Sequence, residues 1–287
     1  MNRFRILAFL AIFLLWSCED YGQLKKIQHL PSAVKEVSGM EKFPNSRHLW
    51  MINDSGNKNM LYGLKPGNSN LKTIEIKNAK NKDWEDLARD LSGNLYIGDF
   101  GNNRNKREDL VIYKIKNPET NTSGETTATK IFFRLEDQKE YPPKRKNRNF
   151  DIEAFAHLNG KLYLFTKNRS SKSNGISKIY RLPDEPGEYT AQLIGKIKTC
   201  KKNSCRITAA AVSQDQEKLV LLTNNSVYII TDFKNDNFAN GKIEYLELGH
   251  NSQKESVCFK DSTSLYIADE QTAATGRHLY EFRINQN

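Results

Sequence analysis

A short motif led by an acidic residue recurs along the chain at intervals of roughly 50 residues, the range of propeller and solenoid repeats. Its first residue is a glutamate four times and a threonine once, as Glu36, Glu85, Glu153, Thr208 and Glu255. In a closed ring of repeats, one residue per repeat faces its copies across a central channel. Four converging carboxylates repel one another, and a divalent cation relieves that repulsion. We therefore predict that the four glutamates bind a divalent cation.

The predicted cation is calcium, with magnesium as the alternative. Calcium takes six to eight oxygen ligands in irregular geometry. Zinc prefers His and Cys ligands, and the chain has five histidines with no His-x-x-x-His pair. In the alternative without a metal, the glutamates pair with Lys35, Lys254 and Arg206 or bind backbone amides. The repeat then serves packing alone.

A second motif, an apolar run closed by a small polar residue, follows each copy of the first. The runs are 49–53, 95–99, 162–166, 219–223 and 265–269. Such runs are typical of buried strands. Because antiparallel neighbours place the start of one strand beside the end of the next, the closing residues should lie at the same mouth of the channel as the glutamates. Two of them, Asp99 and Asp269, are the catalytic candidates, either as groups that support the cation's ligands or as a general base.

Loops at this mouth combine glycine with oxygen-bearing side chains, and basic residues surround them. Turn formation explains the loops equally well, and charge runs are also typical of solvated surface. Basic side chains around a metal centre, however, suit a phosphate or carboxylate ligand. The predicted ligand-binding residues are Asn53, Asp54, Asn102, Asn103, Arg104, Lys167 and Arg206.

Strands must position all of these residues, since no helix pattern is visible. Each repeat adds a third strand with a tyrosine and a less regular fourth, and the fifth repeat lacks its fourth strand. The segment Leu24–Leu30 is the candidate for that strand. We predict an all-β, five-bladed β-propeller with four-stranded blades, whose N-terminal strand closes the last blade. Ring closure of this kind protects sheet edges.

The first residues are typical of a targeting segment. Arg3 and Arg5 precede an apolar run, Ile6–Trp16, that is too short to span a bilayer. The run ends in Leu15-Trp-Ser-Cys18, which resembles the bacterial lipoprotein box and implies a lipid on Cys18. An ordinary signal peptide with a chance cysteine is the alternative.

The predicted organisation follows from this leader. Residues 1–17 are the lipoprotein signal peptide, 18–22 a short lipid-anchored tether, and 23–287 a single β-propeller domain. The location is the bacterial cell envelope, at the outer membrane or cell surface rather than the inner membrane. Lipid membrane, through Cys18, is then one partner, and we expect the protein to be a monomer.

Charge and cysteines narrow the choice of partner. The formal charge of +10 at pH 7 suits an anionic ligand or lipid surface. No basic stripe interleaved with aromatics indicates nucleic-acid binding, and no P-loop or Gly-x-Ser-x-Gly motif is present. In an oxidising compartment, Cys200 and Cys205 could form a loop disulfide. Two free thiols are the alternative.

Four motifs carry a family resemblance. They are Glu36-Val-Ser-Gly, Trp50-x-x-Asn-Asp-Ser-Gly-Asn, Asp83-Trp-Glu-Asp and Asp99-Phe-Gly-Asn-Asn. Together they resemble a set of Bacteroidetes-type secreted or lipid-anchored propeller proteins, most of them uncharacterised. The match is close over residues 36–113 and rests on the repeat pattern elsewhere. It implies no particular reaction.

The chain is also similar, at the level of the fold, to the five-bladed calcium-activated nucleotidases, or apyrases. In that family, inner-strand glutamates gather around an axial calcium, a role that the resemblance implies for Glu36, Glu85, Glu153 and Glu255. Thr208 departs from the pattern. The family's other motifs do not align, so nucleotide specificity is not implied.

The residues leave two main functions open. The first is a lipid-anchored extracytoplasmic propeller whose acidic mouth binds a divalent cation and an anionic ligand and hydrolyses a phosphoester. The second is a non-catalytic surface lipoprotein that binds a protein, peptide or glycan. A lactonase-like or glycosidase-like hydrolase is a third reading, because paired carboxylates allow it.

Overall fold

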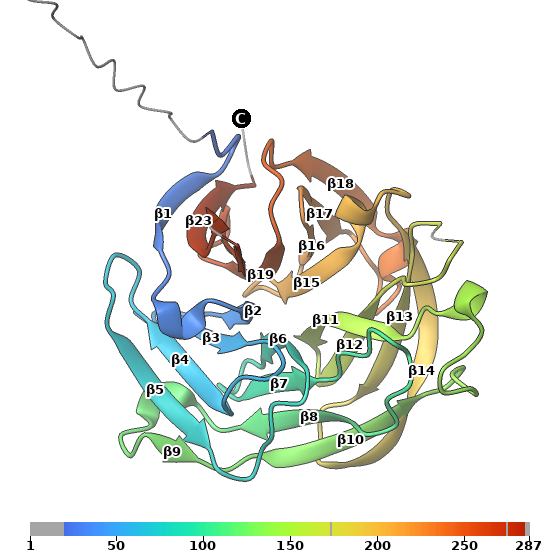
Figure 1. Cartoon of the computed structure of the whole chain (residues 1–287), viewed down its shortest axis with the longest axis horizontal. Coiled ribbons are helices and arrows are strands. Elements are labelled where there is room, and N and C mark those ends of the chain that lie inside the picture. Colours follow the sequence, from blue (N-terminus) through green and yellow to red (C-terminus); the bar gives the residue numbers. More distant parts are fainter. Residues whose placement is uncertain (1–19, 173, 274, 285–287) are drawn as a thin grey trace, which may run out of the picture.

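The computed structural model describes residues 20–172, 174–273 and 275–284, which form an all-β, β-propeller-like ring (Figure 1). The predicted signal peptide and Cys18 lie outside the described residues. Strands make up almost all of the regular structure in this part of the chain. The short 3₁₀ turns are η1 (Ser32–Val34), η2 (Pro118–Thr120), η3 (Arg145–Asn147), η4 (Asn203–Cys205) and η5 (Phe238–Asn240).

Antiparallel runs of strands repeat along the chain, each starting near the ring axis and moving outward. The strands are β1 (Lys25–His29), β2 (Val37–Glu41), β3 (Leu49–Asn53), β4 (Met60–Leu64), β5 (Leu71–Ile76), β6 (Trp84–Arg89), β7 (Leu95–Asp99), β8 (Leu110–Ile115), β9 (Glu125–Thr126), β10 (Thr129–Leu135), β11 (Asp151–Leu158), β12 (Lys161–Lys167), β13 (Ile176–Pro183), β14 (Gly187–Lys198), β15 (Ile207–Val212), β16 (Leu219–Thr223), β17 (Ser226–Thr231), β18 (Lys242–Glu247), β19 (Lys254–Phe259), β20 (Ser264–Asp269), β21 (Gln271–Thr272), β22 (Thr275–Gly276) and β23 (His278–Arg283).

The innermost strands contact one another in a closed circle. β2 contacts β6, β6 contacts β11, and the circle continues through β15 and β19 back to β2. Figure 1 shows these strands around the centre and the outer strands at the periphery. The apolar runs predicted at 49–53, 95–99 and 219–223 coincide with the second strands β3, β7 and β16.

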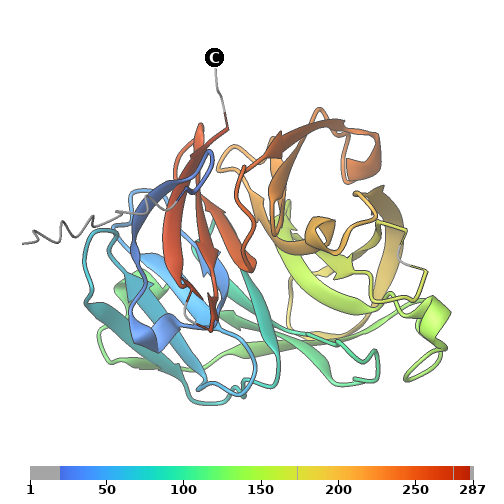
Figure 2. The same cartoon turned by 45° about the horizontal axis from the view of Figure 1, so that its top comes forward.

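The N-terminal and C-terminal strands lie side by side. β1 pairs with β23 in antiparallel register, so that His29 faces His278, and the blue and red strands run together in Figure 2. This pairing is the one predicted for the segment Leu24–Leu30. It joins the two ends of the described chain into one four-stranded sheet, β1-β23-β20-β19.

Two sheets hold more than the four strands that the repeat predicts. The first half of β14 pairs in parallel with β10, which merges two neighbouring runs into one eight-stranded sheet. The short strand β9 adds to the outer edge of β5. Outer-strand pairing of this kind covers sheet edges that would otherwise be exposed.

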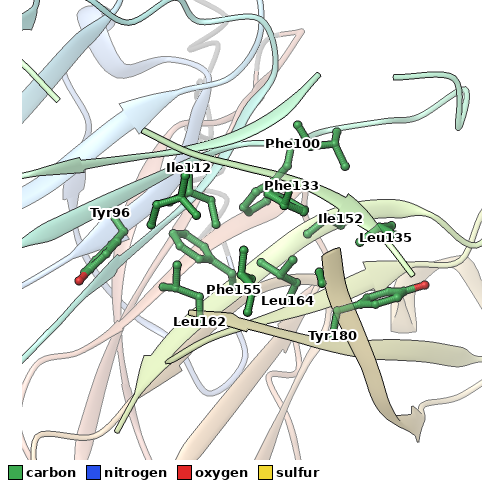
Figure 3. Close-up of a cluster of buried hydrophobic side chains, with 14 of the residues drawn as sticks. Tyr96, Phe100, Ile112, Phe133, Leu135, Ile152, Phe155, Leu162, Leu164 and Tyr180 are labelled. Carbon is green, nitrogen blue, oxygen red and sulfur yellow. The ribbon is translucent and has the colours of Figure 1, made fainter. Parts of the chain in front are cut away.

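Hydrophobic clusters fill the spaces between neighbouring runs of strands. In the cluster of Figure 3, Phe155 on β11 packs edge to face against Phe100, which follows β7, at a centroid distance of 5.2 Å. Each fully buried side chain of this size stabilises the fold by roughly 1.5–3 kcal/mol. The clusters fix how the inner strands sit against one another, and thereby the positions of the side chains at the channel mouths.

A buried carboxylate ties three inner strands together inside the channel. Asp86 on β6 accepts hydrogen bonds from the backbone N–H groups of Leu87, of Phe155 on β11 and of Ala210 on β15. Its exposed fraction is 0%. Burial raises the pKa of Asp86 well above its ordinary value, and the three N–H donors oppose that rise. Asp86 is therefore part of the frame and not of a mouth.

Candidate cation and anion site

Every inner strand begins with the same irregularity, a β-bulge in its pairing with the second strand. The residues skipped by the register are Ser38, Glu85, Glu153, Thr208 and Glu255. A bulge leaves one residue unpaired and redirects its side chain. The site is thus built from one bulge residue per inner strand, at the end of the ring where these strands begin. We call this end the acidic mouth.

The register corrects the alignment of the first repeat, because the bulge residue of β2 is Ser38 and not Glu36. The Ser38 hydroxyl donates to the Trp84 carbonyl oxygen at 2.6 Å. Thr208 makes the same bond, also at 2.6 Å, to the carbonyl of Lys254. In both cases the acceptor directly precedes the bulge glutamate of the next inner strand. Two of the bulge positions therefore hold hydroxyls that stabilise the ring.

Glu36 lies two residues before its bulge, at the rim. Its side chain is 39% exposed and 3.5 Å from Lys35 Nζ, and it accepts a hydrogen bond from Asn57 Nδ2 at 2.5 Å. Its structural equivalents are Asp83 and Asp151, which precede Glu85 and Glu153 by the same two residues. The Asp-x-Glu spacing in these two repeats was a signal from which the correct register could have been found.

Three carboxylates from two neighbouring repeats form the densest acidic cluster of the mouth. Asp54 follows β3, Asp83 precedes β6, and Glu85 is the β6 bulge residue; one oxygen of each lies within 4.8 Å of the others. Glu85 is 7% exposed. Within the described part of the chain, no hydrogen bond or ion pair holds the Glu85 or the Asp83 carboxylate. We call these three residues the acidic triad.

Gly101 makes room for the triad. A Cβ atom at this position would lie 1.9 Å from Glu85 Oε1 and 2.5 Å from Asp83 Cγ. Glycine is thus required where the loop after β7 crosses the two carboxylates. The Asp-Phe-Gly-Asn-Asn sequence, predicted to bind ligand through its asparagines, contributes to the triad through its glycine.

The carboxylates of this mouth resist ionisation. Burial, and then the charges of Glu153, Asp54 and Asp83, raise the pKa of Glu85 well above its ordinary value. Burial and the Asp54 charge raise the pKa of Asp83 to about 6. Two further acids have the same cause: burial and neighbouring carboxylates raise the pKa of Glu255 to about 7 and of Glu270 to about 8. Among these acids, Glu85 has only carboxylates as the neighbouring charges that shift its pKa most.

Around Glu153, two cations neutralise the acidic side chains. Glu153 binds Lys167 Nζ at 2.8 Å and Arg169 Nη2 at 2.7 Å, and Arg169 Nε also binds Asp151 at 2.5 Å. Although burial opposes it, these two cations lower the pKa of Glu153. Lys167 Nζ lies 3.8 Å from Glu255. The predicted ligands Glu153 and Glu255 therefore already have cationic partners.

Arg206 senses the charges of this ion-paired group without forming an ion pair with it among the described residues. It directly follows the disulfide Cys200–Cys205, and its Nε is buried without a partner among the described residues. Burial, and then the charge of Arg169, lower the pKa of Arg206. Lys167 and Arg206 were predicted from the sequence as ligand-binding residues; Arg169 was not part of that set.

The two catalytic candidates, Asp99 and Asp269, bind backbone N–H groups and neighbouring side chains. Asp99 binds Arg107 Nη2 at 2.9 Å and accepts the backbone N–H of Asp83 at 3.1 Å. Asp269 accepts the backbone N–H of His278 at 2.7 Å and the Tyr280 hydroxyl at 2.9 Å. Both are at most 1% exposed in their side chains. Their place at the ends of second strands is as predicted, and there they fix loops.

Of the remaining predicted ligand residues, some form hydrogen bonds within the fold and others are exposed on the surface. Asn102 accepts the backbone N–H groups of Lys106 and Arg107 and so shapes its own loop. Asn103 and Arg104 are exposed. Asn53 donates to the Ala33 carbonyl at 2.7 Å, while its Oδ1 is buried without a partner in the described residues.

A second cluster lies at the opposite mouth, where the inner strands end. His157 Nε2 lies 2.8 Å from Asp184 Oδ2, and the Tyr96 hydroxyl contacts Asp90 and Asp184 at 3.1 and 3.2 Å. A metal-binding histidine almost always donates its other ring N–H to an acceptor. His157 Nδ1 is buried with no such acceptor in the described residues. Although the spacing of Asp90, His157 and Asp184 would allow a metal, the cluster lacks this second acceptor and is a hydrogen-bond network in the structure.

Comparisons with known proteins support the fold alone. No family model matches the chain, and no curated protein matches it. One similar structure is the PQQ-bound aldose sugar dehydrogenase from Streptomyces coelicolor, with a TM-score of 0.53 and 9% identity, covering 91% of this chain and 97% of that one. Another is a nidogen/laminin complex, with a TM-score of 0.48 and 14% identity, covering 82% and 73%. The described residues contain no helix of the length and hydrophobicity that a membrane span requires.

Proposed function

We propose that the acidic mouth binds a divalent cation at Asp54, Asp83 and Glu85. One observation carries this proposal: the Glu85 carboxylate is buried among other carboxylates and has no partner of its own among the described residues. A buried charge without a partner costs several kcal/mol. A cation among the three oxygens removes that cost, and protonation of Glu85 is the alternative.

Calcium fits this donor set best. The triad offers carboxylate oxygens only, and hard cations select oxygen ligands. The three residues come from two loops and one bulge, so they provide an irregular set that calcium tolerates more readily than magnesium does. Calcium at this point would also weaken the repulsion that acts on Glu255 and Glu270.

The same mouth is proposed to bind an anionic ligand on its basic side. Lys167 and Arg169 both bind Glu153 there, the charge of Arg169 also acts on Arg206, and a cation on the acidic side adds positive charge. Metal and arginines together suit phosphate or carboxylate groups. For a phosphoester, a bound divalent cation would supply Lewis-acid polarisation of an ester oxygen. Glu255, with a pKa of about 7, is the carboxyl best matched to accept a proton near neutral pH.

Binding without turnover is the second candidate, and a specific observation favours it. Asp99 and Asp269, the two catalytic candidates, are committed to backbone and side-chain hydrogen bonds. A surface lipoprotein that holds a protein, peptide or glycan needs no general base. A phosphatase assay with p-nitrophenyl phosphate and nucleoside triphosphates, in calcium and in magnesium, separates the two: hydrolysis that Glu255→Gln abolishes supports catalysis.

The architecture and location are part of the proposal. We interpret the ring as a five-bladed propeller, because five inner strands contact one another in a closed circle. The disulfide Cys200–Cys205 is consistent with an oxidising compartment such as the cell envelope. Lipid attachment at Cys18 would tether the ring to the outer membrane or cell surface. Metabolic labelling with a clickable palmitate, lost in Cys18→Ala, tests the anchor.

Calcium titration followed by native mass spectrometry tests the cation site. The wild-type protein should bind calcium, and Glu85→Gln should weaken binding about tenfold or more. Glu217→Gln is the matched control, since Glu217 is exposed at the opposite mouth. Equal calcium binding by wild type and Glu85→Gln would show that the triad is not the site.

A further inference from the structure

We propose that His29 and His278 bind a divalent transition metal of the zinc class where the first and last strands of the ring meet. This site is separate from the acidic mouth: it lies on the strand pair β1–β23, uses none of the residues of the acidic triad, and takes another class of metal ion.

Ring closure brings the two histidines together across 249 residues of sequence. Their Nε2 atoms lie 3.3 Å apart, and their ring centroids lie 4.2 Å apart. A short motif such as His-x-x-x-His cannot report a pair of this kind, because the two residues come from opposite ends of the described chain. The pair exists only through the pairing of β1 with β23.

A β-bulge in β1 sets the register that makes the histidines face each other. The register shifts by one residue between Lys26 and Gln28. The shift places His29 opposite His278; without it, His29 would lie opposite Arg277. Directly opposite residues of an antiparallel pair have their side chains on the same face, with Cβ atoms about 4.5–5.5 Å apart. Bulges redirect side chains, and this one aligns two imidazoles.

Asp269 and Tyr280 orient the inner histidine, His278. Asp269 ends β20, the neighbour of β23, so a carboxylate and two imidazoles follow one another across three adjacent strands. The Tyr280 hydroxyl donates to Asp269 Oδ2 at 2.9 Å, and its oxygen therefore accepts from His278 Nδ1 at 3.1 Å. With the proton on Nδ1, the neutral imidazole has a lone pair on Nε2, which faces His29. A metal-binding histidine almost always has its other N–H held in this way.

The separation of the two nitrogens suits one metal ion. Two nitrogens that each lie about 2.0–2.1 Å from a tetrahedral zinc ion are about 3.3–3.4 Å apart, and the separation of 3.3 Å between the two Nε2 atoms is long for a hydrogen bond. His29 is exposed, so a metal can enter from solvent, and water can fill its remaining positions. A zinc ion in line with both lone pairs separates the ring centres by roughly 5 Å, which the exposed His29 ring reaches by turning outward.

Nitrogen ligands select the class of metal. Imidazole suits zinc, copper and nickel, whereas calcium and magnesium take oxygen ligands. The histidine pair and the acidic triad are therefore expected to take different ions. A metal held by His29 and His278 also ties β1 to β23, so that it stabilises the strand pair that joins the two ends of the described chain.

Isothermal titration calorimetry with zinc chloride, in an excess of calcium, tests the site. Wild type should bind zinc, and His29→Gln, which keeps a hydrogen-bond donor beside His278 but loses the imidazole, should weaken binding about tenfold or more. Zinc should also raise the Tm of wild type by a few degrees and leave that of His29→Gln unchanged. His48→Gln is the matched control, since His48 lies in another repeat, where its Nδ1 is 3.0 Å from Glu119.

The histidine site and the proposed calcium site can fail separately. Equal zinc affinity in wild type and His29→Gln, or no zinc binding by wild type, overturns the histidine site and leaves the pair as a hydrogen bond. Loss of zinc binding in Glu85→Gln also overturns it, because zinc would then lie at the acidic triad. If wild type binds zinc through His29 and binds no calcium, the proposed function fails while the histidine site stands.

Discussion

The two mouths of the ring share one set of strands and differ in how their charges are satisfied. At the opposite mouth, Glu41 and Arg89 pair at 3.4 Å, and Arg89 also donates to the Lys42 carbonyl and to Gln214. At the acidic mouth, Glu85 is equally buried and has no partner among the described residues. The opposite mouth shows that this fold can provide a buried glutamate with a cationic partner, so the lack of one at Glu85 is a specific feature of the acidic mouth. The acidic mouth, where Glu85 has no partner among the described residues, is therefore where a ligand is expected.

The largest expected effect is at the opposite mouth. Arg89→Met removes the partner of buried Glu41 together with two further hydrogen bonds, and should destabilise the protein by about 3 kcal/mol, or roughly 6–12 °C in Tm. Thermal unfolding with and without calcium measures it. The loss should be the same in both conditions, because this mouth holds no proposed ligand. Arg47→Met, an exposed neighbour, is the control.

At the acidic mouth, removing a charge should raise the stability of the protein instead of lowering it. Without calcium at pH 8, Glu85→Gln removes a charge that has only like neighbours, and should raise Tm by a few degrees, on the order of 1 kcal/mol. With calcium, the wild-type protein gains stability and the variant does not. Glu217→Gln should match wild type in both conditions. A lower Tm for Glu85→Gln in EDTA would mean that Glu85 has a stabilising partner.

The acidic mouth should also make the stability of the protein depend on pH. Burial and nearby charges raise the pKa of Glu270 to about 8 and of Glu255 to about 7, from an ordinary value of 4.5. Acids with a raised pKa take up protons on folding, so stability is full below pH 4.5 and falls as pH rises towards 8. Urea unfolding between pH 4.5 and 8 in EDTA should show this fall, and calcium should reduce it. Glu270→Gln should flatten the EDTA curve.

The strands could be predicted from the sequence because their signal is local. An apolar run closed by Asn53 or Asp99 reports a buried strand and its end, and five such runs imply a ring. The ring closure by residues 25–29 followed from the missing outer strand. The disulfide Cys200–Cys205 could be predicted because its two cysteines are close in the sequence and the expected compartment is oxidising.

The site could be predicted only in its general place, because its detail depends on register and partners. A bulge inserts one residue without any composition signal, so Glu36 was aligned where Ser38 lies. Whether a glutamate is free or paired depends on other repeats: Glu153 is neutralised by Lys167 and Arg169, while Glu85 is not. Pairing of this kind follows from the three-dimensional arrangement of side chains.

The smallest expected effect tests that register directly. Glu36 is 39% exposed and already bound by Asn57, so Glu36→Gln should change calcium affinity by less than about threefold, a residual long-range charge effect. Asp83→Asn, at the equivalent position of the next repeat, should weaken binding about tenfold or more, because Asp83 belongs to the triad. Native mass spectrometry of both variants gives the comparison. Equal losses would return Glu36 to the cation site and restore the symmetric ring of glutamates, since the alignment by sequence and the register by bulge make opposite predictions for this one pair.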